Sequence, residues 1–104
     1  MKIEVFIKKD RIQVDAKAIY DSETKETIVK KGSRVSKSIS QAKTFKGVKA
    51  ILKAREGIID DEGKVLNDVA FKSSSTAGNF VTGRSTDGLS SWKTIDGKKL
   101  KEVL

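Results

Sequence analysis

The stretch from Phe71 to Gly97 constrains the fold most, because it combines a helix start, a helix stop and two turns in one short run. Ser73 stands where an N-cap belongs, since its hydroxyl can accept a hydrogen bond from a free amide of a first helical turn. Three apolar residues then recur at helical spacing: Ala77, Phe80 and Val81. Gly83 is suited to the left-handed conformation that ends many helices. The pattern therefore predicts a short helix over 74–83 with one buried face.

A tight turn is predicted after this helix. Asp87-Gly88 combines a side chain that can bond its own backbone with a residue that tolerates positive φ. The only tryptophan, Trp92, follows with Ile95 on a segment that we expect to be extended, and Asp96-Gly97 forms the turn that ends it. The chain is thus predicted to pass from a helix to a strand within a few residues.

The first third of the chain alternates apolar and polar residues, which is typical of half-buried antiparallel strands. The alternation covers 2–8 and 13–20, and Thr27 to Val29 forms a shorter β-prone run. Polar turns separate the three runs, so a three-stranded antiparallel meander is predicted. Residues 65–71 are predicted to form a further strand that returns the chain to the serine-rich helix start.

An amphipathic helix is predicted from Phe45 to a stop at Gly57. The expected buried face consists of Phe45, Val48, Ile51 and Leu52, and the opposite face is a basic stripe of Lys46, Lys49 and Lys53. The preceding residues 33–44 are rich in serine and lysine and fit either a loop or a short helix. Because proline, repeats and linker-like runs are absent, residues 1–104 are predicted to form a single α+β domain: a three-stranded meander, an amphipathic helix, then strand, short helix and strand.

Positive charge is concentrated in one window of the sequence. The net charge is +8, and the residues from Lys30 to Arg55 include nine basic residues and no acidic one. These are Lys30, Lys31, Arg34, Lys37, Lys43, Lys46, Lys49, Lys53 and Arg55. Such a block is typical of a surface that binds a phosphate-rich partner. The alternative is a lysine-rich surface that serves solubility alone, although such surfaces usually mix both signs of charge.

Enzymatic chemistry is not expected from this composition. The chain has no histidine and no cysteine, so the commonest general base and the commonest metal ligands are missing. The acidic run 60–62 lacks the spacing of a calcium loop, and residues 57–65 differ from a phosphate loop because Val65 replaces the required hydroxyl residue. We therefore expect no enzyme, metal or cofactor. With no long apolar run, we also expect a cytoplasmic protein without a membrane partner.

The second half of the chain resembles the signature of a family called domain of unknown function 4357. The family pattern is Phe-x-Ser-Pro-Ser-small-Ala, then Gly-Arg-Ser, Asn-Gly, Trp-Lys and Asp-Gly-x-x-Leu. The residues that match it are Phe71, Ser73, Ser75, Ala77, Gly83, Arg84, Ser85, Gly88, Trp92, Lys93, Asp96, Gly97 and Leu100. Ser74 replaces the usual proline and Asp87 replaces the usual asparagine. Residues 16–20 and 29–33 are similar to the family's Ala-x-Ala and Lys-Gly-Ser elements.

The resemblance implies an accessory role beside enzymes that act on nucleic acid. The family is often found as the C-terminal part of GIY-YIG nucleases and next to restriction and modification proteins. Its serine-rich helix and tryptophan segment are similar to a restriction-associated module proposed to read modified DNA. A nuclease or a methyltransferase is thus the partner protein that the resemblance suggests.

Together these features predict a non-enzymatic nucleic-acid-binding module, for DNA in preference to RNA. The candidate contact residues are Lys30, Lys31, Gly32, Ser33, Arg34, Lys46, Lys49, Lys53, Ser73, Ser75, Arg84, Trp92 and Lys93. Arg84 is the leading single candidate, because a planar guanidinium can bond phosphate or guanine through two N–H groups. For Ser73, Ser75 and Trp92, a structural role in capping or in the core is the favoured alternative. The rival function is a protein-interaction module that docks onto an acidic partner subunit.

Overall fold

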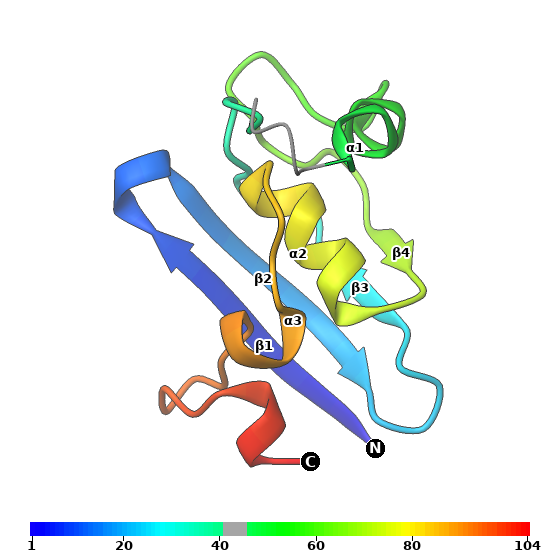
Figure 1. Ribbon diagram of the computed structural model, residues 1–104, viewed down its shortest axis with the longest axis vertical. Coiled ribbons are helices and arrows are strands. Elements are labelled where there is room, and N and C mark those ends of the chain that lie inside the picture. The colour runs from blue at the N-terminus through cyan, green and yellow to red at the C-terminus, as the bar shows by residue number, and fades with distance from the viewer. Residues whose placement is uncertain (41–45) are drawn as a thin grey trace.

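The computed structural model describes residues 1–40 and 46–104, and its centre is one antiparallel sheet (Figure 1). The sheet has the strand order β1-β2-β3-β4. The strands are β1 (Lys2–Lys9), β2 (Val14–Asp21), β3 (Thr27–Val29) and β4 (Val69–Phe71). A 3-10 turn at Asp10–Ile12 connects β1 to β2. The predicted three-stranded meander is confirmed, and β4 extends it by pairing antiparallel with β3.

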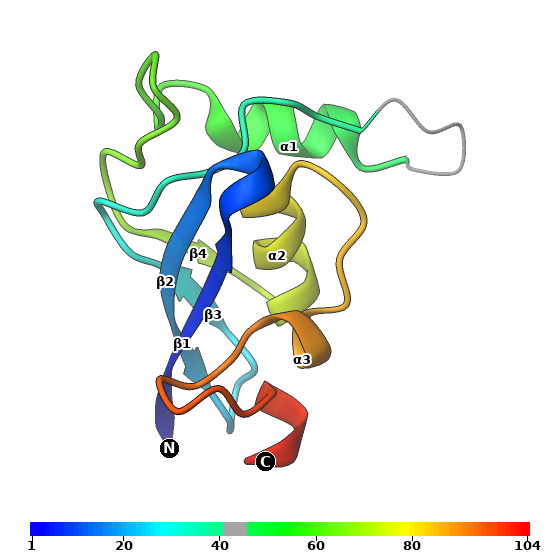
Figure 2. The same cartoon turned by 90° about the vertical axis from the view of Figure 1, so that its left-hand side faces the viewer.

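Three α-helices accompany the sheet in the part of the chain that the structure describes, so the α+β class is confirmed. They are α1 (Val48–Arg55), α2 (Ser74–Thr82) and α3 (Gly88–Ser91). In both views α2 and α3 lie on the same face of the sheet, and α1 packs beyond α2 (Figures 1 and 2). Within 1–40 and 46–104 no helix covers the other face, and no helix there is long and apolar enough to cross a membrane.

The core lies between the sheet and α2. Because side chains alternate along a strand, one face of β1 to β3 supplies a continuous apolar layer. Its buried members are Val5, Ile7, Val14, Ala16, Ala18, Tyr20 and Val29. From the other side α2 buries Ala77, Phe80 and Val81, and Trp92 and Leu100 complete the cluster.

Helix α2 forms as its sequence predicts. The Ser73 hydroxyl accepts a hydrogen bond from the Thr76 amide at 3.1 Å, which satisfies one of the free N–H groups of the first turn. Gly83 ends the helix with φ of 74°, and a Cβ at this position would lie 2.4 Å from the Ser38 carbonyl oxygen. Glycine is therefore required here both by its conformation and by the close approach of the neighbouring chain.

The buried face of α1 differs from the prediction. Phe45 lies outside the described residues, and Leu52 is 55% exposed, so its assignment to the buried face is wrong. Ile51 is buried as expected, and the second buried residue of α1 is Arg55. The two share a face because residues four apart lie one above the other on a helix.

The other local predictions are confirmed only in part. The strand predicted over 65–71 is limited to β4, and Val65 instead forms an isolated bridge with Ile59. Asp87-Gly88 begins α3 rather than a tight turn, because the Asp87 carboxylate accepts hydrogen bonds from the Leu89 amide and the Ser90 hydroxyl. Residues 33–40, the described part of 33–44, contain no helix.

The C-terminal part pairs with the sheet without forming a regular strand. Lys93 makes isolated antiparallel bridges with Phe6 on one side and Lys99 on the other. The turn at Asp96-Gly97 is confirmed, since the Gly97 amide donates to the Thr94 carbonyl at 2.9 Å and Gly97 has φ of 86°. A 3-10 turn at Leu100–Glu102 follows.

Arg55 joins α1 to α2 through buried hydrogen bonds. Its Nε and Nη2 donate to the Phe80 carbonyl oxygen, and its Nη1 donates to that of Ser36 at 2.7 Å. The guanidinium also lies 5.7 Å from the centre of the Phe80 ring. Burial lowers the pKa of Arg55 to about 10, so the side chain is still charged at neutral pH. The charge is placed near the C-terminal end of α2, where the helix dipole favours a cation.

Replacing Arg55 should destabilise the fold. In Arg55→Met two buried carbonyl groups lose their donors, and we expect the free energy of unfolding to fall by about 2–4 kcal/mol. Urea denaturation followed by tryptophan fluorescence measures this change. Lys53→Met, which alters an exposed lysine of the same helix, is the matched control and should change stability by less than about 0.5 kcal/mol. Equal effects of the two substitutions would contradict the structural role of Arg55.

Candidate functional site

The sheet face without helices carries a row of residues centred on Phe6. Residues directly opposite each other in antiparallel pairs project to the same face. Phe6 is opposite Lys17 of β2 on one side and opposite Lys93 on the other, and Lys99 is opposite Lys93 in turn. We call Lys99, Lys93, Phe6 and Lys17 the central row. Val5 and Ile7, the neighbours of Phe6 in β1, point to the core, which confirms that Phe6 points away from it.

A parallel row of charged residues lies beside the central row. Lys8 is opposite Asp15, Asp15 is opposite Arg34, and Arg34 is opposite Lys64. We call these four residues the outer row. Val35 and Val65, which follow Arg34 and Lys64, are buried, so the two basic side chains project to the uncovered face. The two rows with Lys31 and Gly32 are here named the open face.

Both backbone hydrogen bonds of Phe6 lie on the side of Lys93. Its amide donates to the Lys93 carbonyl at 2.7 Å, and the Lys93 amide donates to the Phe6 carbonyl at 2.9 Å. The pair of Phe6 with Lys17 is therefore of the non-hydrogen-bonded kind, in which the opposite side chains approach most closely. The Phe6 ring, which is partly exposed, thus lies between the stems of two lysines.

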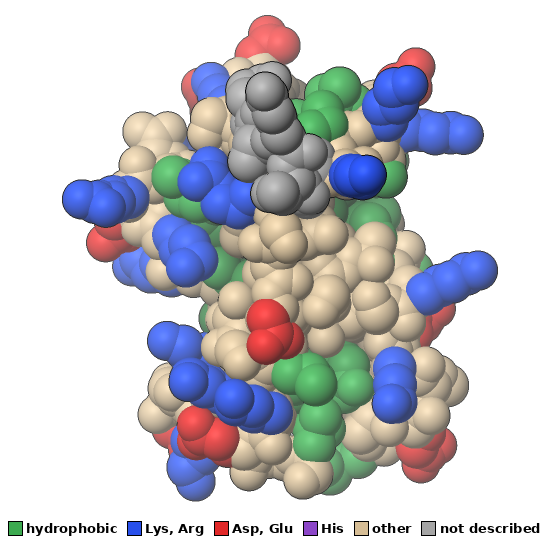
Figure 3. Space-filling model, viewed as in Figure 1, with side chains coloured by type: hydrophobic (Ala, Val, Ile, Leu, Met, Phe, Trp, Pro, Cys, Tyr) green, Lys and Arg blue, Asp and Glu red, His purple; other side chains and the backbone are tan. Residues whose placement is uncertain are grey.

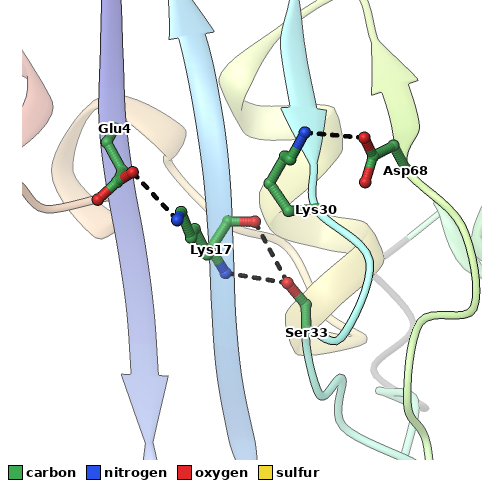
Figure 4. Close-up of polar contacts among 5 residues, drawn as sticks. All are labelled: Glu4, Lys17, Lys30, Ser33 and Asp68. Carbon is green, nitrogen blue, oxygen red and sulfur yellow. Dashed lines mark hydrogen bonds and ion pairs between the residues drawn. The ribbon is translucent and has the colours of Figure 1, made fainter.

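Ser33 completes the pairing of β2. Its hydroxyl accepts a hydrogen bond from the Lys17 amide at 3.0 Å and donates to the Lys17 carbonyl at 3.2 Å (Figure 4). The residue is buried, and its hydroxyl gives the Lys17 amide a partner within the sheet edge. Ser33 also lines the larger hollow of the open face, so its contact with a ligand stays a prediction.

Two adjoining hollows lie on the open face. They have volumes of about 330 Å³ and 270 Å³, and Asp15 and Gly32 line both. Phe6 and Lys31 line the larger hollow, whereas the smaller one reaches Arg34 and Lys64. The space next to Gly32 is open, since a Cβ there would meet nothing within 4 Å.

Acidic side chains partly neutralise two lysines near this face. Glu4 lies 3.1 Å from the Lys17 ammonium, and both side chains are about half exposed. Asp68 accepts a hydrogen bond from the Lys30 ammonium at 2.8 Å (Figure 4) and another from the Lys31 amide at 2.7 Å. Of the predicted contacts, Lys30 is therefore already held by a carboxylate, whereas Lys31 uses only its backbone in this interaction.

The structure divides the predicted basic surface into two parts. Lys31 and Arg34 lie on the open face, but the exposed stripe of Lys46, Lys49 and Lys53 belongs to α1, which lies beyond α2 (Figures 1 and 2). Acidic residues also approach the second part, since a hollow beside α1 is lined by Lys37 and Lys53 together with Glu56, Asp60 and Asp61. Arg55 points inward, and Lys43 lies outside the described residues. On the helix side of the molecule, basic side chains are scattered with acidic ones among them (Figure 3).

Three of the predicted contact residues instead hold the fold together. Ser73 caps α2, and the Ser75 hydroxyl accepts a hydrogen bond from the Gly88 amide at 2.9 Å. Trp92 is 0% exposed and donates from Nε1 to the Ser74 carbonyl at 2.9 Å. A fully buried indole cannot stack on a nucleobase, so this proposed role of Trp92 is corrected, and the favoured alternative of a core residue is confirmed.

Arg84 lies apart from the open face. It follows α2, and its guanidinium donates from Nε to the Thr82 carbonyl at 3.1 Å and from Nη2 to the Ser38 hydroxyl at 3.4 Å. It lines a cleft of about 530 Å³ between the β1–β2 turn and the α2–α3 connection, together with Arg11 and Asp87. Lys93 is the only predicted contact from the signature region that lies on the open face.

The comparisons with known proteins identify a family without a described activity. The model of the family described as domain of unknown function (DUF4357) matches residues 5–104. Neither the curated proteins nor the solved structures contain a match.

The charge state of Asp68 should depend on Lys30. The hydrogen bond from Lys30, followed by that from the Lys31 amide, lowers the pKa of the Asp68 carboxyl. Because the folded-state pKa is the lower one, the stabilisation is present above the unfolded-state pKa and is lost as pH falls through the folded value. We expect Lys30→Met to raise the Asp68 pKa towards its ordinary value in an NMR titration. Lys49→Met, on α1, should leave the pKa unchanged, and an unshifted Asp68 in Lys30→Met would contradict the interaction.

Proposed function

We propose a nucleic-acid-binding role for this chain, which belongs to the family described as domain of unknown function (DUF4357). In this proposal the protein is a non-enzymatic accessory module of the cytoplasm that binds DNA in preference to RNA. The proposal rests on one observation: basic residues from five separate segments of the chain meet on a sheet face that no described helix covers.

The charge of the open face supports a polyanionic ligand. Its basic residues are Lys8, Lys17, Lys31, Arg34, Lys64, Lys93 and Lys99. Fewer acidic side chains lie among or beside them: Glu4, Asp15, Asp60 and Asp68. A phosphate backbone releases bound counterions when lysine and arginine replace them, which favours binding to such a face. The hydrogen-bonded sheet fixes the spacing of these residues, so their charges combine into one positively charged surface.

The family resemblance suggests where such a module acts. A domain that binds DNA without cutting or modifying it can hold a nuclease or a methyltransferase of a restriction-modification system on its substrate. The rival role, docking onto an acidic partner subunit, uses the same charge but does not require a nucleic-acid ligand.

Charge removal on the open face tests the proposal. We expect Arg34→Gln/Lys64→Gln to weaken binding to labelled DNA of mixed sequence, because the variant lacks two cations of the outer row. The slope of log affinity against log salt should become shallower by about two units for duplex and by slightly less for single strands. Fluorescence anisotropy at a series of salt concentrations provides both quantities.

The matched control removes two charges from α1. Lys49→Gln/Lys53→Gln has the same net charge as the open-face variant and should keep the wild-type affinity and slope. If this control loses binding and the open-face variant does not, the α1 stripe is the contact surface and the proposed site is wrong. If the wild-type protein binds neither single-stranded nor duplex DNA, the nucleic-acid role itself is overturned and an acidic protein partner is favoured.

A further inference from the structure

We infer that the open face binds single-stranded nucleic acid, with one base stacked on the ring of Phe6. The inference rests on the proposed function and specifies the form of its ligand. Stacking on an aromatic side chain combined with lysines along the backbone is the general means by which proteins bind unpaired strands.

Phe6 is an unusual residue for its position. Its neighbours on the same face of β1 are Glu4 and Lys8, as expected for a solvated strand face. The other aromatic residues that the structure describes are turned to the core side, with Tyr20, Phe80 and Trp92 buried and Phe71 5.0 Å from Phe80 between ring centres. Phe6 alone among them belongs to the open face, so its partly exposed ring adds nothing to the core described above.

The surroundings of Phe6 match a nucleotide in charge and shape. Lys17 and Lys93 are its direct neighbours across the sheet, which places their Cβ atoms within about 4.5–5.5 Å of its own. A base on the ring would therefore lie between two ammonium groups, and that of Lys17 would exchange Glu4 for a phosphate. The hollow of about 330 Å³ next to Phe6 leaves space for an adjoining sugar or base, and Lys31 stands at its edge.

The outer row continues the site beyond the first nucleotide. Arg34 and Lys64 line the smaller hollow, which shares Gly32 with the larger one. Asp15 lies between the two hollows, and its carboxylate disfavours a phosphate at that point but can accept a hydrogen bond from a base amino group. The basic residues at the rim and the carboxylate in the middle suit a strand whose phosphates lie outside and whose bases face the sheet.

A duplex fits this arrangement less well. Its bases are stacked on one another, so their faces are not available to Phe6, and its convex backbone can contact only the lysines and Arg34. A single strand gains the same phosphate contacts and adds the stacking of a base on the Phe6 ring. We therefore expect the protein to bind an unpaired strand more tightly than a duplex that carries the same number of phosphates.

Substitution of Phe6 tests the stacking contact. Phe6→Leu keeps an apolar side chain of similar bulk but removes the aromatic face, and we expect a loss of roughly 5- to 100-fold in affinity for a labelled oligodeoxynucleotide. Phe6→Tyr keeps the ring and should retain most of the affinity. Affinity for a hairpin duplex should be the same in the wild type and both variants. A 2-aminopurine in the single strand reports stacking directly, because its fluorescence should be quenched by the wild type and Phe6→Tyr but not by Phe6→Leu.

The outcomes separate this inference from the proposed function. If single strands and duplex bind equally well, or if Phe6→Leu binds single strands like the wild type, the stacking site is overturned while charge-dependent binding stands. If Phe6→Tyr loses as much affinity as Phe6→Leu although both unfold at the wild-type urea concentration, stacking is likewise excluded. If Arg34→Gln/Lys64→Gln also binds like the wild type, the open face is not the contact surface, and if the wild type binds no DNA, the proposed function fails as well. Tighter binding of the RNA strand of the same sequence would overturn the preference for DNA only.

Discussion

One-sided packing of the sheet determines the rest of this structure. Alternation along β1 and β2 directs one set of side chains into a single apolar layer, and within residues 1–40 and 46–104 it is α2 that covers this layer most broadly. In a domain of 104 residues the apolar surface available suffices for one such core, so the opposite face of the sheet stays in contact with solvent. The strand register therefore sets which charged residues of β1 and β2 lie on that face.

The residues that carry the family resemblance shape this arrangement from within the core. Ser75 binds the start of α3, and the carbonyl of Ser74 binds the indole of Trp92, so α2, α3 and the following segment form one packed unit. A Cβ on Gly88 would lie 2.3 Å from the Ser74 carbonyl carbon, which shows how closely the segments approach. Because Trp92 points inward, Lys93 must point to the open face beside Phe6. The signature residues thus contribute to the site mainly by orienting Lys93 towards the open face, rather than by contacting a ligand themselves.

The sequence correctly predicted those elements that depend on residues close together in the chain. The cap at Ser73 and the alternation in the first strands correctly specified α2 and the meander, because both depend on neighbouring residues. The inward turn of Arg55 was not predictable, since its partners, the carbonyls of Ser36 and Phe80, belong to distant segments. The same holds for the site: alternation places Phe6 and Lys17 on the solvent face, but no sequence pattern shows that Lys93 joins them. Counting charge along the chain grouped α1 with residues 30–34, although Lys31 and Arg34 belong to the open face and α1 lies beyond α2.

A map of the amide chemical shifts of the labelled protein, as a single-stranded oligonucleotide is added, tests the open-face site most directly. We expect the largest changes at Phe6, Lys17 and Lys93 and in the adjoining residues 31–34, while the amide shifts of α1 stay unchanged. Changes centred on α1 or on the cleft of Arg84, with none at Phe6, would contradict binding at the open face.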